Sequence, residues 1–90
     1  MDANLLVMDC VIVSPDDTVF EEEVVRVSAP GPFGEVAVLP QHTPIYTRIN
    51  KGKVVAWLDD KKTKEIEIDG GILRARDNKV TIIVGFDEEE

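Results

Sequence analysis

The chain has 90 residues and carries 18 acidic against 10 basic side chains, giving a formal net charge of −8. This acidity argues against binding to nucleic-acid phosphates or adhesion to anionic lipid, since both select Lys and Arg. The length suits one domain with a modest core, and the single cysteine, Cys10, excludes an internal disulfide and fits a reducing compartment. No apolar run approaches the ~20 residues of a membrane-spanning helix, and no secretion leader is recognisable.

Short stretches with strand-like alternation follow one another, separated by turn residues. The expected strands cover residues 5–13, 18–21, 24–29, 35–39, 45–49, 54–58, 65–69, 72–76 and 79–84. Glu22-Glu23 is expected to interrupt the second strand, 50–53 to form a hairpin loop, and Gly70-Gly71 to form a bend or bulge. No window shows the apolar spacing of a helix. About eight to ten short strands predict an all-β fold, an antiparallel sandwich or barrel.

Several side chains have a predicted place in such a fold. Phe20 is expected to anchor the core, and Cys10 to be a small buried hydrophobe. Arg74 and Arg76 alternate on one face of a strand. The favoured expectation is that their positive charges offset those of Glu65 and Glu67 across a sheet. The alternative is that they contact an acidic partner.

The stretch from Pro30 to Pro44, PGPFGEVAVLPQHTP, is the most constrained part of the chain. It holds four prolines, two glycines and the only histidine in fifteen positions. Pro30-Gly31 and Phe33-Gly34 have turn composition, and Pro40 is expected to end the short strand before it. Two stiff loops around one short strand indicate a surface built for contact.

The sequence offers little for catalysis. His42 could pair with Cys10 or with a carboxylate, but no catalytic signature surrounds either residue, so a structural or interface role for His42 is favoured. One Cys and one His far apart do not make a metal site, and the acidic pairs lack a calcium-loop pattern. We therefore expect no cofactor, no metal and no enzymatic activity. The catalytic alternative is a small hydrolase that uses His42 and an acidic partner.

Two motifs resemble a known family. Pro30-Gly31-x-x-Gly34-Glu35-Val36-x-Val38-Leu39-Pro40-x-His42-x-Pro44 is similar to the signature of the epsilon subunit of rotary ATP synthases, called delta in mitochondria. Gly70-Gly71-Ile72-Leu73-x-Ala75-x-x-Asn78-x-Val80-Thr81-Ile82 is similar to the closing hairpin of that subunit. The likeness runs from about residue 5 to 84, almost the whole chain.

The resemblance implies a β-sandwich in the central stalk, or rotor, of a proton-translocating ATP synthase. It implies a non-catalytic subunit that fastens the gamma subunit to the c-subunit ring and couples ion flow to ATP synthesis. Such a subunit would be peripheral, at the cytoplasmic face of an energy-transducing membrane, with no direct lipid insertion. The interface residues carried over by motif are Phe33, Gly34 and Glu35, and, in a second loop expected at the same end, His42, Thr43 and Pro44. For the apolar gamma surface the candidates are Val11, Phe20 and Trp57.

The chain departs from the family pattern at three places. Pro32-Phe33 makes the first loop bulkier than usual, and Gln41 stands where the family usually has Gly. Family members usually continue into two C-terminal helices, whereas this sequence ends at Glu90, so neither ATP binding nor helix-mediated inhibition is expected. The expected organisation is a sandwich domain over 1–86 and an acidic tail over 87–90. The alternative reading is a free-standing β-sandwich adaptor or ligand-binding module.

Overall fold

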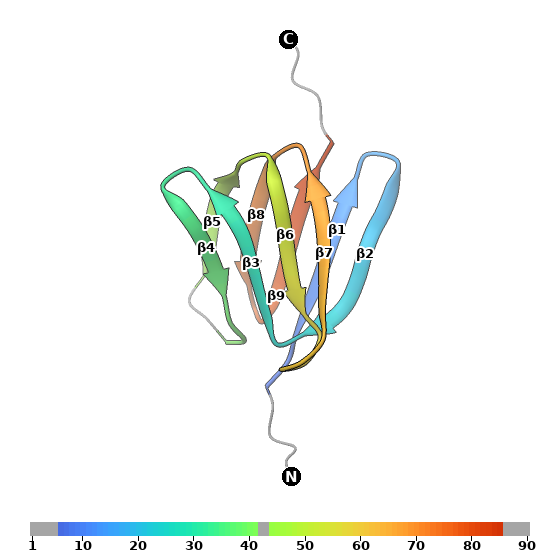
Figure 1. Ribbon diagram of the computed structural model, residues 1–90, viewed down its shortest axis with the longest axis vertical. Coiled ribbons are helices and arrows are strands. Elements are labelled where there is room, and N and C mark those ends of the chain that lie inside the picture. The colour runs from blue at the N-terminus through green and yellow to red at the C-terminus, as the bar shows by residue number, and fades with distance from the viewer. Residues whose placement is uncertain (1–5, 42–43, 86–90) are drawn as a thin grey trace.

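The computed structural model describes residues 6–41 and 44–85. The described residues form nine strands and no helix, so none of them lies in a helix that could span a membrane (Figure 1). The strands are β1 (Met8–Ser14), β2 (Asp17–Val24), β3 (Arg26–Gly31), β4 (Gly34–Val38), β5 (Ile45–Ile49), β6 (Gly52–Trp57), β7 (Thr63–Ile68), β8 (Gly71–Arg76) and β9 (Lys79–Val84).

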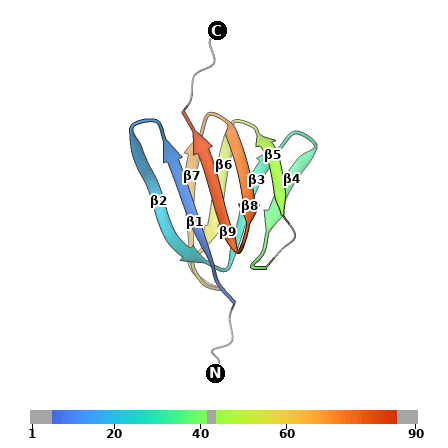
Figure 2. The ribbon, with the colours of Figure 1, turned by 180° about the vertical axis from the view of Figure 1, so that it is seen from behind.

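The strands form two sheets packed face to face. The five-stranded sheet has the order β2-β1-β9-β8-β5, and the four-stranded sheet has the order β4-β3-β6-β7. Figure 1 looks onto the four-stranded sheet, and Figure 2 shows the five-stranded sheet from behind. Neighbouring strands are antiparallel except β1 and β9, which run parallel. The predicted all-β sandwich is therefore confirmed, with one parallel pair that the sequence analysis did not foresee.

The core lies between the two sheets because alternate side chains of each strand point inward. From the five-stranded sheet come Cys10, Ile12, Leu73, Val80 and Ile82, all with no exposed surface. The four-stranded sheet contributes Val27, Val54 and Ala56, which are also fully buried. Phe20 is buried at the β2 edge, so its predicted anchoring role and the burial of Cys10 are both confirmed.

The acidic run Glu21-Glu22-Glu23 does not interrupt β2. The strand pairs with β1 from Asp17 to Val24, and the only irregularity in that register lies at Ile12/Val13. The expected interruption at Glu22-Glu23 is wrong. Because β2 is an edge strand, the three carboxylates can remain exposed to solvent while their backbone pairs with β1. Charged side chains on a sheet edge also oppose pairing with other chains.

The segment after β5 does not make a hairpin. β5 pairs with β8 in one sheet, whereas β6 pairs with β3 and β7 in the other. Asn50 instead carries the chain between sheets, and its N–H donates to the carbonyl of Pro30 at 2.7 Å. The predicted loop over 50–53 is right only at Asn50 and Lys51, because Gly52 and Lys53 already belong to β6. The predicted pairing of its flanking strands is wrong, because loop composition does not determine which strands pair.

Two further expectations change with this topology. Arg74 and Arg76 lie on β8, while Glu65 and Glu67 lie on β7 in the other sheet, so they cannot balance one another across a sheet. The chain bends at Asp69 and Gly70 connects it to β8, which begins at Gly71; the register of β8 shows no bulge.

Candidate functional site

The exposed end of the β3–β4 hairpin is a two-residue turn made by Pro32 and Phe33. Gly31 pairs with Gly34 directly below the turn, and the Phe33 ring is fully exposed. Of the two turn pairs that composition suggested, Pro30-Gly31 belongs to β3 and Gly34 to β4, so only Phe33 lies in the turn itself. Gly34 has φ +126°, a conformation that side chains disfavour, and Pro32 presets its own φ. We call residues 31–35 the tip.

The tip is held from behind by the segment between β5 and β6. The Nδ2 of Asn50 donates to the carbonyl of Gly31 at 3.1 Å, next to the backbone bond from Asn50 to Pro30. A side chain on Gly52 would press against the Pro30 ring. These contacts fix the end of β3, on the side from which the chain enters the turn. The sequence analysis missed Asn50, because nothing local links an asparagine to a hairpin nineteen positions away.

Glu35 lies on the outer face of the four-stranded sheet, and Ser28 holds its carboxylate. The Ser28 hydroxyl donates to Glu35 Oε2, and Ser28 is only 4% exposed. A groove of about 380 Å³ runs alongside, lined among others by Pro30, Lys53 and Val55. Glu35 is thus an exposed carboxylate of fixed position, with one ammonium group on the opposite wall of the groove.

The second loop lies at the other end of β4. It follows Leu39 and leads to Pro44, after the last residue of β4, whereas the turn of the tip comes before the first residue of β4, Gly34 (Figure 1). The expectation that both loops sit at one end is therefore wrong, because they flank a single extended strand of five residues. His42 and Thr43 lie outside the described residues.

Asn78 makes three hydrogen bonds at the end of the sandwich where the second loop lies. Its Oδ1 accepts from the N–H of Gln41 at 2.9 Å, and its Nδ2 donates to the carbonyl of Val7 at 2.8 Å. Its own carbonyl accepts from the N–H of Asp9 at 3.2 Å. One side chain in the β8–β9 turn thus ties the second loop to the first strand. Asn78 was part of the quoted motif, but its bonding role was not predicted.

The three candidates for an apolar gamma surface do not share a face. Phe20 is in the core. Val11 is half-buried on the outer face of the five-stranded sheet, and Trp57 is half-buried on the outer face of the four-stranded sheet, where the Arg26 guanidinium lies 4.7 Å from its ring centre. Phe20 is therefore excluded as a contact residue.

The described residues contain no group of three or more metal-ligating side chains. Burial raises the pKa of the Cys10 thiol to about 12. A thiol with such a pKa is almost entirely protonated at neutral pH, and the thiolate is the reactive form. Cys10 is therefore a structural residue rather than a nucleophile.

Comparison with known proteins gives the family. The family model for the β-sandwich domain of the ATP synthase delta/epsilon chain matches residues 7–88. The ATP synthase epsilon chain of Pelotomaculum thermopropionicum is 40% identical over 77 residues, which are 86% of this chain and 57% of that protein. The epsilon chain of Xanthomonas euvesicatoria is 39% identical over 75 residues, 83% of this chain and 54% of that protein.

Solved structures agree on the fold. A structure of the Euglena gracilis mitochondrial ATP synthase with OSCP, F1 and c-ring contains a chain that superposes with a TM-score of 0.81 at 21% identity, over 93% of this chain and 54% of that one. A chain from the central stalk and c-ring of the Tetrahymena thermophila enzyme gives 0.72 at 13% identity, over 88% and 63%. The chain spans a little over half the length of the curated relatives it matches. On the match over residues 7–88, the chain belongs to the family of β-sandwich domains of ATP synthase delta and epsilon chains.

Proposed function

We propose that this β-sandwich is a non-catalytic part of the rotor of a proton-translocating ATP synthase. In that role it fastens the gamma subunit to the c-subunit ring and so couples ion flow to ATP synthesis. It acts as a peripheral subunit at the cytoplasmic face of an energy-transducing membrane. Family membership supports the assignment to the complex, and the solved structures that share the fold come from ATP synthase assemblies that include the c-ring.

The observation that carries the proposal is the braced tip. A contact that transmits torque must keep its shape under load, and a preformed loop loses little conformational entropy when it binds. Asn50 fixes the tip's backbone and Ser28 fixes the Glu35 carboxylate. We assign Phe33, Gly34 and Glu35 to the contact with polar loops of the ring.

The second loop serves a separate contact. Since Pro44 lies at the end of β4 away from the tip, His42, Thr43 and Pro44 are assigned to the interface with a different part of the rotor, in which gamma is the candidate. A domain with one contact surface at each end can join two other subunits, here the ring and gamma.

The test uses the cognate ATP synthase reconstituted in vesicles with either the wild-type chain or a variant. Phe33→Ser and Glu35→Gln are expected to lower ATP-driven proton pumping relative to ATP hydrolysis by about threefold or more, since each removes an interface contact. Glu67→Gln is the matched control, an exposed carboxylate on β7 of the same sheet.

The change in coupling can be assigned to the interface only if the variants are as stable as the wild-type chain. Because Phe33 and Glu35 are exposed, both variants are expected to keep the free energy of unfolding within about 0.5 kcal/mol of wild type. Full coupling with both variants would remove the tip from the interface. Failure of the wild-type chain to bind either gamma or the ring would favour the free-standing adaptor.

A further inference from the structure

Two short connections cross between the sheets at the end of the molecule where the tip lies (Figure 1). Residues 50–51 lead from β5 to β6, and residues 69–70 lead from β7 to β8. The strand residues that flank the two connections are paired with each other in both sheets: Ile49 with Gly71, and Gly52 with Ile68. The two connections are therefore held alongside one another.

The second of these connections has the composition at which an aspartate can form a succinimide. Of the aspartates in the sequence only Asp69 is followed by glycine, and no asparagine is. Glycine has no Cβ, so the Gly70 nitrogen is the least hindered nucleophile that can follow an aspartate. Asp69 is exposed, Gly70 belongs to neither strand, and the described residues give the Gly70 N–H no hydrogen-bond acceptor. The amide is therefore not held by a ladder.

The reaction at this step needs only water. The Gly70 nitrogen attacks Cγ of Asp69, and its proton leaves with the hydroxyl of the protonated carboxyl group as water, which closes the succinimide ring. Water then opens the ring at either carbonyl. Attack at Cγ restores aspartate, whereas attack at the main-chain carbonyl of Asp69 breaks its bond to the Gly70 nitrogen and leaves isoaspartate. One water leaves and one enters, so the net change moves one methylene from the side chain into the backbone.

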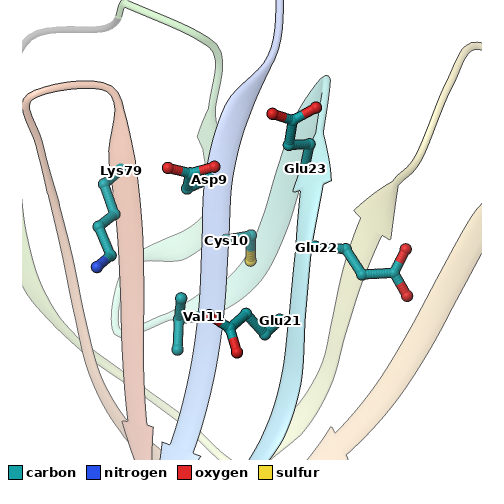
Figure 3. Close-up of a pocket in the computed structure, with 7 residues that line it drawn as sticks. All are labelled: Asp9, Cys10, Val11, Glu21, Glu22, Glu23 and Lys79. Atoms are coloured by element: carbon teal, nitrogen blue, oxygen red, sulfur yellow. The ribbon is translucent and has the colours of Figure 1, made fainter.

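Asp9 provides a comparison within the same molecule, because exposure of a carboxylate is not enough for this reaction. Figure 3 shows its side chain on the open face of β1, in a hollow that Lys79 also lines. The next residue, Cys10, has no exposed surface and is paired with Glu22 on β2 and with Val80 on β9. The nitrogen that follows Asp9 therefore lies within paired backbone on both sides.

We propose that Asp69-Gly70 converts spontaneously to isoaspartate in the folded chain and that the conversion loosens the tip. Both ends of this two-residue connection are fixed, since Ile68 is buried and Gly71 is paired on both sides. An added methylene must therefore displace the connection itself. Little room is available, because a Cβ on Gly70 would lie 3.3 Å from the Ile49 carbonyl oxygen and 3.7 Å from the Lys51 nitrogen.

Asn50 carries this displacement to the tip. Its N–H donates to the carbonyl of Pro30 at 2.7 Å, and its Nδ2 donates to the carbonyl of Gly31 at 3.1 Å. Hydrogen bonds weaken as distance and angle depart from these values, so a shift of Asn50 weakens both. None of these steps requires the proposed role in ATP synthase, because every group belongs to this chain.

The test is incubation of the wild-type chain in neutral buffer at physiological temperature. Isoaspartate is detected by methyl transfer from S-adenosylmethionine with an isoaspartyl methyltransferase and is located by peptide mapping, in which the succinimide has lost one water. Conversion is expected to be at least about tenfold faster at Asp69 than at Asp9, a modest difference in activation free energy. Asp69→Glu keeps the charge but needs a larger ring and should stay unmodified, whereas Asp69→Asn forms the same succinimide with loss of ammonia and is the positive control.

Two further measurements test the role of the folded structure. The rate in buffer is expected to be within about tenfold of the rate in urea, because the connection reacts without unfolding. Converted and unconverted chains are then separated, and hydrogen exchange of the Asn50 N–H is compared by NMR. Exchange is expected to be at least about threefold faster in the converted chain, since the bond to Pro30 opens more often.

Three outcomes would overturn the proposal. Isoaspartate that forms at Asp69 only in urea, or equally fast at Asp9, would remove the site. Conversion that leaves exchange of the Asn50 N–H unchanged would remove the link to the tip. These outcomes are independent of the rotor assignment, which the coupling measurement decides separately.

Discussion

Two asparagines hold the backbone at the two ends of β4. Asn50 bonds to the carbonyls of Pro30 and Gly31 at the tip, and Asn78 bonds to Gln41 and Val7 at the other end. An asparagine suits both places because its side chain can donate to a carbonyl and accept from an N–H. Substituting Asn50 would remove the side-chain bond to the carbonyl of Gly31 but not its backbone bond to Pro30. Substituting Asn78 would remove the bonds to Gln41 and Val7.

Gln41 shows how a departure from the family pattern is accommodated. The resemblance led us to expect Gly at this position, and Gln41 has φ +61°, in the left-handed region that favours glycine. Its backbone N–H bonds to Asn78, so the backbone keeps this conformation in spite of the side chain. The cost of a non-glycine residue there is of the order of 1 kcal/mol.

Cys10 predicts a dependence of stability on pH in the alkaline range. Burial raises the pKa of its thiol from 9.0 to about 12. Between these values the unfolded chain loses the thiol proton and the folded chain keeps it, so the unfolded state binds fewer protons. The contribution of Cys10 to the free energy of unfolding is therefore fully present below pH 9.0 and is lost as pH rises towards about 12.

The measurement is urea unfolding of wild type and Cys10→Ala at about pH 8 and about pH 10.5. The variant is less stable at both pH values because it leaves a cavity, but the difference between the two proteins is expected to shrink at the higher pH. All other groups titrate equally in both. An unchanged difference would show that the folded thiol ionises near its ordinary pKa.

At the scale of the element, strand positions followed from the sequence more closely than strand partners did. Residues 45–49 and 79–84 were predicted as β5 and β9 to the residue. Alternation and turn residues are local properties, so they reveal where a strand lies. The choice of β8 rather than β6 as the partner of β5 depends on two sheets closing over one core, which no short window contains. The contacts of Asn50 with Gly31 and of Ser28 with Glu35 also depend on the tertiary structure, so no short window predicts them. The position of the tip, in contrast, was predicted from the motif.

Gly71 illustrates an element-level constraint with a testable cost. It begins β8 and is paired on both sides, with Ile49 on β5 and Val84 on β9. A Cβ at this position would overlap the carbonyl oxygen of Ile83. Gly71→Ala is therefore expected to force the two strands apart and to lower the free energy of unfolding by about 1–3 kcal/mol.

Urea denaturation followed by circular dichroism measures this loss. Asp69→Ala, an exposed change in the same bend, serves as the control and should alter stability by less than about 0.5 kcal/mol. If Gly71→Ala proved as stable as the control, β9 would have room to move, and the close approach of its backbone to β8 would not be the reason for glycine at this position.

At the scale of the whole molecule, the sandwich closes by pairing its first strand with its last. β1 and β9 run parallel side by side in the middle of the five-stranded sheet, from Asp9↔Lys79 to Val13↔Ile83. A parallel pair cannot form through a tight hairpin, so this contact joins segments seventy residues apart. Most of the chain must therefore be present before the sheet is complete.

This closure predicts where the domain ends. A chain that stops after Asp77 lacks β9, and with it the buried side chains of Val80, Ile82 and Val84. It also leaves β1 and β8 without their shared neighbour. It is expected not to fold, with circular dichroism and a dispersed amide NMR spectrum as the measurements. A chain that stops after Phe86 keeps the nine strands of the described residues and lacks the proposed acidic tail, so its free energy of unfolding should be within about 0.5 kcal/mol of that of the full chain. A large loss of stability in this second chain would show that the last four residues belong to the domain.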